Sequence, residues 1–297
     1  MKNFLCIGDI MMDVSVVIDS EIHHGGDTQA YITTQGGGAA ANVARWLAHL
    51  GQDVFLCSRI ADDPNGVILQ AELDKYCVRH ANHRVPNEKT GTVVVLVTED
   101  GERTMFPDSG SNSGLSATDL PPLDNINAAY LSGYALINSK SRTNVTQMIQ
   151  LIRAKGIPIV FDPGTVGALR RIPDSLLQEW IAMVDILLLN EEEALHISQA
   201  NDLEGALVAL AAKVSIVVIK RGAKGAIAIS QRALTLEVPA PELEVVDTTG
   251  AGDSFTAGFM ASWFADGVLA TAVENGITQA TFCVTNVGAR PPLGKGL

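Results

Sequence analysis

The chain has 297 residues, 47% of them hydrophobic and 18% charged, which is enough to bury the core of one large domain with or without a small appendage. Its net charge is −12 and no basic stripe appears, which argues against binding to polymeric nucleic acid. No apolar stretch reaches the roughly 18 residues of a membrane span and no signal-peptide pattern is present, so we expect a cytoplasmic protein without a membrane partner. The four scattered cysteines form no Cys-x-x-Cys pair, and we expect them to be reduced thiols.

The first third of the chain is rich in β-prone segments separated by polar turns. They predict short strands at residues 4–7, 14–18, 30–34, 53–60, 92–98 and 103–106. A glycine run leads into a helical window at 39–50, and a second helix is expected at 65–75. The segments 14–18 and 30–34 predict one hairpin, and the last two segments predict another around a turn at 99–102. The two hairpins can pair into a small sheet apart from the core.

From residue 128 onward apolar strands alternate with helical windows. The strands are expected at 128–131, 157–161, 186–189 and 216–219, and the helices at 144–154, 175–183, 191–197 and 203–211. A late hairpin at 225–230 and 234–238 and helices at 251–264 and 268–283 complete the chain. This alternation is typical of a parallel sheet with helices on both faces. We expect one α/β domain over residues 1–297, with a parallel-rich central sheet sandwiched by helices and a small β appendage formed by about 14–35 and 90–106.

Polar residues cluster directly after several of the predicted strands. The clusters are Gly8-Asp9 with the nearby Asp13, Asp162-Pro163-Gly164, Asn190-Glu191-Glu192-Glu193, Lys220-Arg221-Gly222 and residues 247–253. Ligands of parallel sheets bind at the carboxyl ends of the strands. We therefore expect these clusters to line a common binding site.

The most informative stretch is Asp247-Thr248-Thr249-Gly250-Ala251-Gly252-Asp253-Ser254, which opens the helix expected from residue 251. Its two glycines lack a Cβ, so the backbone can turn sharply and an outside group can come close. The first amides of a helix have no partner within it and attract anions. An aspartate beside such a site is suited to take a proton from an attacking hydroxyl. The alternative is an ordinary helix start capped by an aspartate.

The earlier glycine run allows a different interpretation. Gly36-x-Gly38-x-x-Ala41, with Asp62 about 20 residues farther on, has the spacing of a dinucleotide-binding fingerprint. The preceding segment, 30–34, contains a tyrosine and two threonines. It is therefore not the continuous apolar run expected of a buried first strand, which argues against this interpretation.

The stretch 247–254 resembles the C-terminal signature of the ribokinase-like (PfkB) family of carbohydrate and nucleoside kinases, and residues 36–42, Gly-Gly-Gly-Ala-Ala-Ala-Asn, resemble its N-terminal glycine signature. Both occur in family order and spacing, and the resemblance covers essentially the whole chain. It implies a ribokinase-like fold whose appendage acts as a lid over the sugar. It also implies ATP-dependent phosphotransfer to a primary hydroxyl of a small sugar. Asp253 would be the general base, and the amides of Gly250, Ala251 and Gly252 would form an anion hole.

The resemblance also implies which residues bind each ligand. The sugar is expected to contact Asp13, Gly37, Gly38, Asn42, Asn112 and Asp253. ATP is expected to contact Asn190, Lys220, Gly222, Gly225, Gly250 and Gly252. The N-x-x-E motif of Asn190 and Glu193 would hold Mg²⁺ through water, and Asp247 and Thr249 lie where the family holds a monovalent cation such as K⁺. Lid sheets of this family often pair between subunits, which implies a homodimer.

The substrate itself stays open between a simple sugar and a nucleoside. Typical ribokinases carry a lysine in the glycine signature that this chain lacks, which argues against ribose. Only a few aromatic residues, such as Tyr31 and Phe106, fall in the expected lid, so a base-stacking pocket is less favoured than a sugar pocket. A non-catalytic sugar-sensing protein of the same fold is the remaining alternative, and the presence of Asp253 and its two glycines argues against it.

Overall fold

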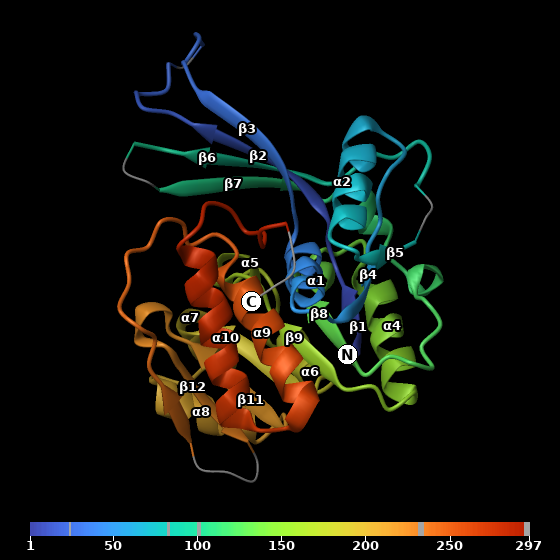
Figure 1. The fold of residues 1–297 in the computed structure, drawn as a ribbon, viewed down its shortest axis with the longest axis vertical. Coiled ribbons are helices and arrows are strands. Elements are labelled where there is room, and N and C mark those ends of the chain that lie inside the picture. Colours follow the sequence, from blue (N-terminus) through green and yellow to red (C-terminus); the bar gives the residue numbers. More distant parts are fainter. Residues whose placement is uncertain (24, 82–83, 100–101, 231–234, 294–297) are drawn as a thin grey trace.

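In the computed structural model, which describes residues 1–23, 25–81, 84–99, 102–230 and 235–293, the strands form one sheet of nine and another of four (Figure 1). The larger sheet lies at the centre of the molecule, with helices on both of its faces. The smaller sheet, called the small sheet below, projects above the carboxyl-terminal helices (Figure 1). This is the parallel-rich α/β architecture with a separate small sheet that the sequence predicts.

From one edge to the other, the strands of the central sheet are β13 (Leu236–Val238), β12 (Ala226–Ser230), β11 (Ile216–Lys220), β10 (Ile186–Asn190), β9 (Ile159–Asp162), β8 (Ala128–Ser132), β1 (Asn3–Ile7), β4 (Asp53–Cys57) and β5 (Arg79–His80). The strands from β11 to β5 pair in parallel, and β12 and β13 add an antiparallel edge. The central strands are apolar along their length because both faces are covered. Phe4 and Cys6 of β1 face one core, and Leu5 and Ile7 face the other.

Two groups of helices enclose this sheet. One face packs against α1 (Ala39–His49), α2 (Pro64–Lys75), α9 (Ala251–Asp266) and α10 (Leu269–Val284). The other packs against α3 (Tyr134–Ile137), α4 (Arg142–Ala154), α5 (Val166–Leu169), α6 (Asp174–Ile181), α7 (Glu191–Ser198) and α8 (Leu203–Ala211). Each helix expected from the sequence is present within a few residues of its predicted bounds. No helix in the described ranges is both long enough and apolar enough to cross a lipid bilayer.

The small sheet consists of β3 (Tyr31–Gly37), β2 (Met11–Val17), β6 (Thr92–Val97) and β7 (Arg103–Asp108), in that order. The two predicted hairpins, β2–β3 and β6–β7, do pair, and they join through a parallel contact between β2 and β6. Because side chains alternate along a strand, Asp13 and Ser15 point to the central sheet while Val14 and Val16 point away.

The glycine run lies partly in a strand, beyond the end of that strand predicted at residue 34. Gly36 and Gly37 are the last residues of β3, and only Gly38, with a positive φ of 94°, forms the junction to α1. Helix α1 therefore connects a strand of the small sheet to β4 of the central sheet. A dinucleotide fingerprint requires both strands to belong to one sheet, so the dinucleotide interpretation is wrong. Residues 100–101 of the expected turn and residue 234 of the late hairpin lie outside the described residues.

Candidate active site

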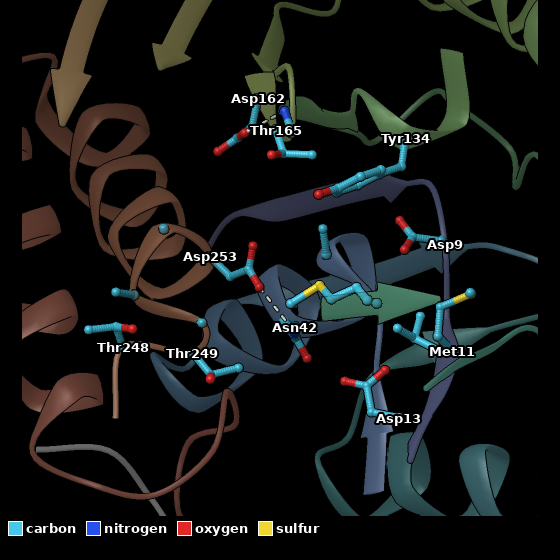
Figure 2. Close-up of a pocket in the computed structure, with 18 of the residues that line it drawn as sticks. Asp9, Met11, Asp13, Asn42, Tyr134, Asp162, Thr165, Thr248, Thr249 and Asp253 are labelled. Carbon is cyan, nitrogen blue, oxygen red and sulfur yellow. Dashed lines mark hydrogen bonds between the residues drawn. The ribbon is translucent and has the colours of Figure 1, made fainter. Parts of the chain in front are cut away.

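A cavity of about 1600 Å³ lies between the carboxyl ends of the central strands and the inner face of the small sheet. All five polar clusters that follow predicted strands contribute residues to its wall, so these strand ends meet at one cavity. Every residue expected to bind a ligand lines this cavity except Gly37. Figure 2 shows Asp253 pointing into the space, with Asp9 and Asp13 across from it and Asp162 beyond.

The notch at the start of α9 depends on a glycine with a left-handed backbone. Gly250 has a φ of 79°, and a Cβ on it would lie only 2.5 Å from the Cα of Ala289. The Ala251 amide donates to the Thr248 carbonyl at 3.3 Å, so this amide is partly committed to the turn. Among the described residues beyond its own helix, a Cβ on Gly252 would come near the Lys220 ammonium alone, at 3.4 Å. The notch is therefore open toward the cavity at Gly252 and has a cation beside it.

Asp253 is held by a relay of polar side chains. The Nδ2 of Asn42 donates to Asp253 Oδ2 at 2.9 Å (Figure 2). The buried Arg45 donates to Asn42 Oδ1 at 3.1 Å, which fixes the orientation of that amide. Burial raises the pKa of Asp253 to about 7; the hydrogen bond from Asn42 opposes the shift and nearby Asp162 adds to it. A carboxylate whose pKa lies near neutrality is suited to act as a general base.

Two more aspartates lie at the small-sheet end of the cavity. Burial raises the pKa of Asp9, whose Oδ1 accepts a 3.2 Å hydrogen bond from Ser132. Burial and repulsion from Asp9 together raise the pKa of Asp13 to about 7. Gly37 lies behind Asp13, where a Cβ would approach its Oδ2 to 2.0 Å, so this glycine makes room for the aspartate. Gly38 reaches the cavity itself.

Asn112 reaches the cavity wall but its amide bonds to the backbone. Its Nδ2 donates to the carbonyls of Ile10 at 2.8 Å and Ser109 at 3.2 Å, and its Oδ1 accepts from the Ile10 amide at 3.3 Å. The side chain thus ties the turn at Gly110–Gly114 to the segment between β1 and β2.

Asn190 and Glu193 form a capping box at the start of α7. Both carboxylate oxygens of Glu193 accept from Asn190, from its amide at 2.9 Å and its Nδ2 at 2.6 Å, while Asn190 Oδ1 accepts from the Glu193 amide at 2.8 Å. Glu193 is only 1% exposed, and burial together with nearby Asp162 raises its pKa to about 8. Lys220 donates to Asp162 Oδ2 at 2.7 Å, so this lysine neutralises an aspartate at the cavity wall.

The turn after β11 brings two glycines to the cavity. Gly222 has a φ of 56° and open space where a Cβ would lie, whereas a Cβ on Gly225 would strike the Val238 carbonyl at 2.0 Å. The neighbouring Arg221 pairs with Glu191 at 3.1 Å and also with Glu237. Its charge is therefore already balanced by two carboxylates of the chain.

Asp247 and Thr249 both accept hydrogen bonds from the side chain of Arg103, a cation of the protein itself. Asp247 Oδ1 accepts from the Thr249 amide at 2.9 Å, from the Thr249 hydroxyl at 2.7 Å and from Arg103 Nη2 at 2.9 Å. Its Oδ2 accepts from the Gly288 amide at 3.0 Å. Partial burial alone would raise the pKa of Asp247, but the hydrogen bonds from Thr249, Arg103 and Gly288 hold it well below its ordinary value.

Sequence reasoning missed four residues of this site as individual participants. Asp9 and Asp162 carried a signal, since Asp9 lies just beyond a buried strand and Asp162 ends another. Arg45 carried none, and nothing in the sequence pairs Arg103 with Asp247. Arg103 contacts a residue 144 positions away, and such a contact follows only from the folded arrangement of the two sheets.

Comparison with known proteins gives a consistent result. The profile of pfkB family carbohydrate kinases matches residues 1–295. An ATP-dependent ribose-1-phosphate kinase from Halopiger xanaduensis is 28% identical over 98% of this chain and 94% of its own, and a fructokinase from Klebsiella pneumoniae is 32% identical over 78% of each. A fructokinase from Vibrio cholerae O395, solved with fructose, ADP and a calcium ion, superposes with a TM-score of 0.83 at 25% identity and covers 99% of this chain and 96% of its own.

Proposed function

The chain belongs to the pfkB family of carbohydrate kinases and is an ATP-dependent kinase, and from this premise we propose that it phosphorylates a primary hydroxyl of a small sugar at the notch before α9. The observation that carries the proposal is the position of Asp253. Its carboxylate faces the cavity in the first turn of α9, one residue beyond the open amide position of Gly252.

We assign the proton transfer to Asp253. With its pKa near 7, the carboxylate can accept the hydroxyl proton as the oxygen attacks, while Asn42 keeps it aimed at the cavity. The amides of Gly250, Ala251 and Gly252 would bind the charge that develops on the transferring phosphoryl group. The bond between Ala251 and Thr248 leaves the amides of Gly250 and Gly252 as the main donors, with the ammonium of Lys220 beside Gly252.

The sugar would occupy the end of the cavity under the small sheet. Asp13 can accept hydrogen bonds from two hydroxyls, and Gly38 allows close approach of the backbone. Gly37 and Asn112 contribute indirectly: Gly37 leaves space for Asp13, and Asn112 holds the backbone that surrounds the ligand.

The nucleotide would occupy the opposite end, at Gly222, Gly225 and Asn190. A divalent metal bound to the phosphates would neutralise their charge, and we propose Mg²⁺. Among the described residues no group of three or more His, Cys, Asp or Glu side chains could hold a metal ion alone. Glu193 has both oxygens engaged by Asn190, so it fits a role toward metal-bound water and not direct coordination.

A nucleoside is the second candidate substrate, and the small sheet provides the observation that favours it. Its inner face presents apolar side chains to the cavity, namely Val93, Val95, Val97, Met105 and Pro107. An apolar wall at the sugar end favours a substrate with a planar or apolar group attached to its sugar. It is less suited to a free hexose, because hydroxyl groups cover the surface of that sugar.

An assay of ADP release over a panel of sugars, sugar phosphates and nucleosides tests the proposal. We expect turnover with at least one of them, and the class that works identifies the substrate. Measurable ATP binding without turnover on any of them would contradict the kinase proposal and favour a sugar-sensing protein.

We also propose that the protein forms a homodimer through the outer face of the small sheet. Ile32 and Phe106 point away from the cavity there and are 60% and 57% exposed, beside Val14, Val94 and Leu96. Sedimentation equilibrium should give twice the chain mass, and Phe106→Glu should give a monomer. A wild-type protein that sediments as a monomer would contradict this arrangement.

The four cysteines are free thiols, in keeping with a cytoplasmic location.

A further inference from the structure

We propose that the guanidinium of Arg103 is the resident cation of the Asp247–Thr249 loop, so that the kinase reaction proposed above needs no monovalent metal ion at this position. The resemblance to the kinase family implies K⁺ at this loop. The side chains of this chain supply a positive charge there from the small sheet instead.

The contacts of Arg103 have the form of a built cation site. Nη2 donates to Asp247 Oδ1 at 2.9 Å, and Nη1 donates to the Thr249 hydroxyl. The guanidinium thus bridges a carboxylate and a hydroxyl through two of its nitrogens, a geometry that a planar fork of donors fits well. The Asp247 side chain is 15% exposed and that of Arg103 is 36% exposed, so the contact is partly shielded from water.

The oxygens of this loop do not fit K⁺ while Arg103 is in place. Asp247 Oδ1 already accepts three hydrogen bonds and Oδ2 accepts one from Gly288. The Thr249 carbonyl accepts from the Cys283 thiol at 3.4 Å. Each carboxylate oxygen offers about two lone-pair sites, so Oδ1 is fully engaged, and Oδ2 keeps one site beside the amide of Gly288. A metal cation would also be placed beside the guanidinium, and the two like charges would repel each other.

This arrangement makes Arg103 a positioning residue for the anion hole. Thr249 directly precedes Gly250, so a contact that fixes Thr249 also fixes where the notch begins. Arg103 is the first residue of β7, in the same small sheet that carries Asp13. The loop therefore receives its cation only when the small sheet lies over the cavity, which links closure over the sugar to order at the phosphate-binding notch.

Steady-state kinetics in KCl and in tetramethylammonium chloride at equal ionic strength test this inference. The wild type should change its rate by less than about twofold between the two salts, since no specific ion site is left to fill. Arg103→Ala should lose at least about tenfold in kcat/KM, the effect of one charge-assisted hydrogen-bonding partner, and should recover part of it in KCl or with added guanidinium. The kcat/KM of Arg103→Lys should lie between the values of the wild type and of Arg103→Ala. Arg79→Ala removes a comparable Arg–Asp pair at 2.7 Å outside the cavity and should behave as the wild type.

Melting temperatures of the ligand-free proteins give a readout that does not depend on finding the substrate. Arg103→Ala should gain about 2 °C or more from KCl over tetramethylammonium chloride, and the wild type should gain nothing specific. Three results would overturn the inference: a wild type that needs K⁺ for its rate or stability, an Arg103→Ala variant equal to the wild type, or a loss in that variant without recovery by either cation. If no substrate is turned over, the function proposal fails while the melting data still decide this one.

Discussion

Replacing Asp253 with asparagine should separate activity from stability, because the carboxylate that serves the reaction is costly to bury. The amide keeps an oxygen that can accept from Asn42, so the local geometry should survive. Loss of the general base should lower kcat by at least about a hundredfold with little change in ATP binding.

The stability effect follows from the raised pKa. In the folded chain the pKa of Asp253 rises from 3.8 to about 7, so folding favours the neutral acid. The stability that the folded protein has with a neutral Asp253 is fully present below the unfolded pKa of 3.8. It is lost as the pH rises through the folded pKa of about 7, because the buried side chain then ionises. At pH 8 the ionised carboxylate should cost up to about 4 kcal/mol relative to a neutral group, and at pH 4 less than about 1 kcal/mol. Asparagine removes this cost, so the variant should be the more stable protein at pH 8 and nearly equal at pH 4.

Urea unfolding at both pH values, together with the ADP-release assay, checks both effects on the same preparations. Asp266→Asn is the matched control, since Asp266 is exposed at the far end of the same helix and accepts from the Val268 amide, which an asparagine oxygen can also do. A rate within about tenfold of the wild type would refute the base assignment. A stability gain that does not change with pH would refute its electrostatic explanation.

Three further results should follow. Gly252→Ala should melt near the wild-type temperature, because the nearest atom to the added Cβ is a lysine Nζ at 3.4 Å. The added methyl group should fill the notch and lower kcat by about tenfold or more. An unchanged kcat would argue against an anion hole at this position. Asn190→Ala removes the side-chain Oδ1 and Nδ2 of the capping box and leaves the backbone amide bond to Glu193, so it should lower the unfolding free energy by about 1 kcal/mol. Urea titration measures this change, and an unchanged value would mean that the Asn190 side chain contributes nothing to stability. The value of kcat/KM should fall as the pH drops from 8 to 5, by about a hundredfold or more, since Asp253 and Asp13 both have a pKa near 7 and become protonated; a flat profile would contradict the account.

The fold followed from the sequence because its signals are local. The central strands of the large sheet have continuous apolar runs inside their ends, as Phe4 to Ile7 show, since they lie between two helical layers. The site could be located for a related reason. Residues such as Asp162 and Asn190 end strands that pair in parallel, so the topology itself brings them to one edge of the sheet.

Features that depend on contacts between distant segments could not be predicted. That Gly36 and Gly37 extend β3 could not be predicted, because the space they leave is filled by the distant side chains of Glu72 and Asp13. The monovalent-cation expectation at Asp247 rested on a motif alone. The arginine that reaches this carboxylate lies on the other side of the cavity and in another part of the chain.

The central claim is that the notch beside Asp253 passes a phosphoryl group from ATP to a substrate hydroxyl. The most direct measurement is ³¹P NMR of a reaction of the full chain with ATP, Mg²⁺ and the best substrate of the panel. The account predicts one new phosphate ester at a primary hydroxyl, formed in step with ADP. Inorganic phosphate in place of an ester, or an ester that Asp253→Asn forms equally fast, would contradict it.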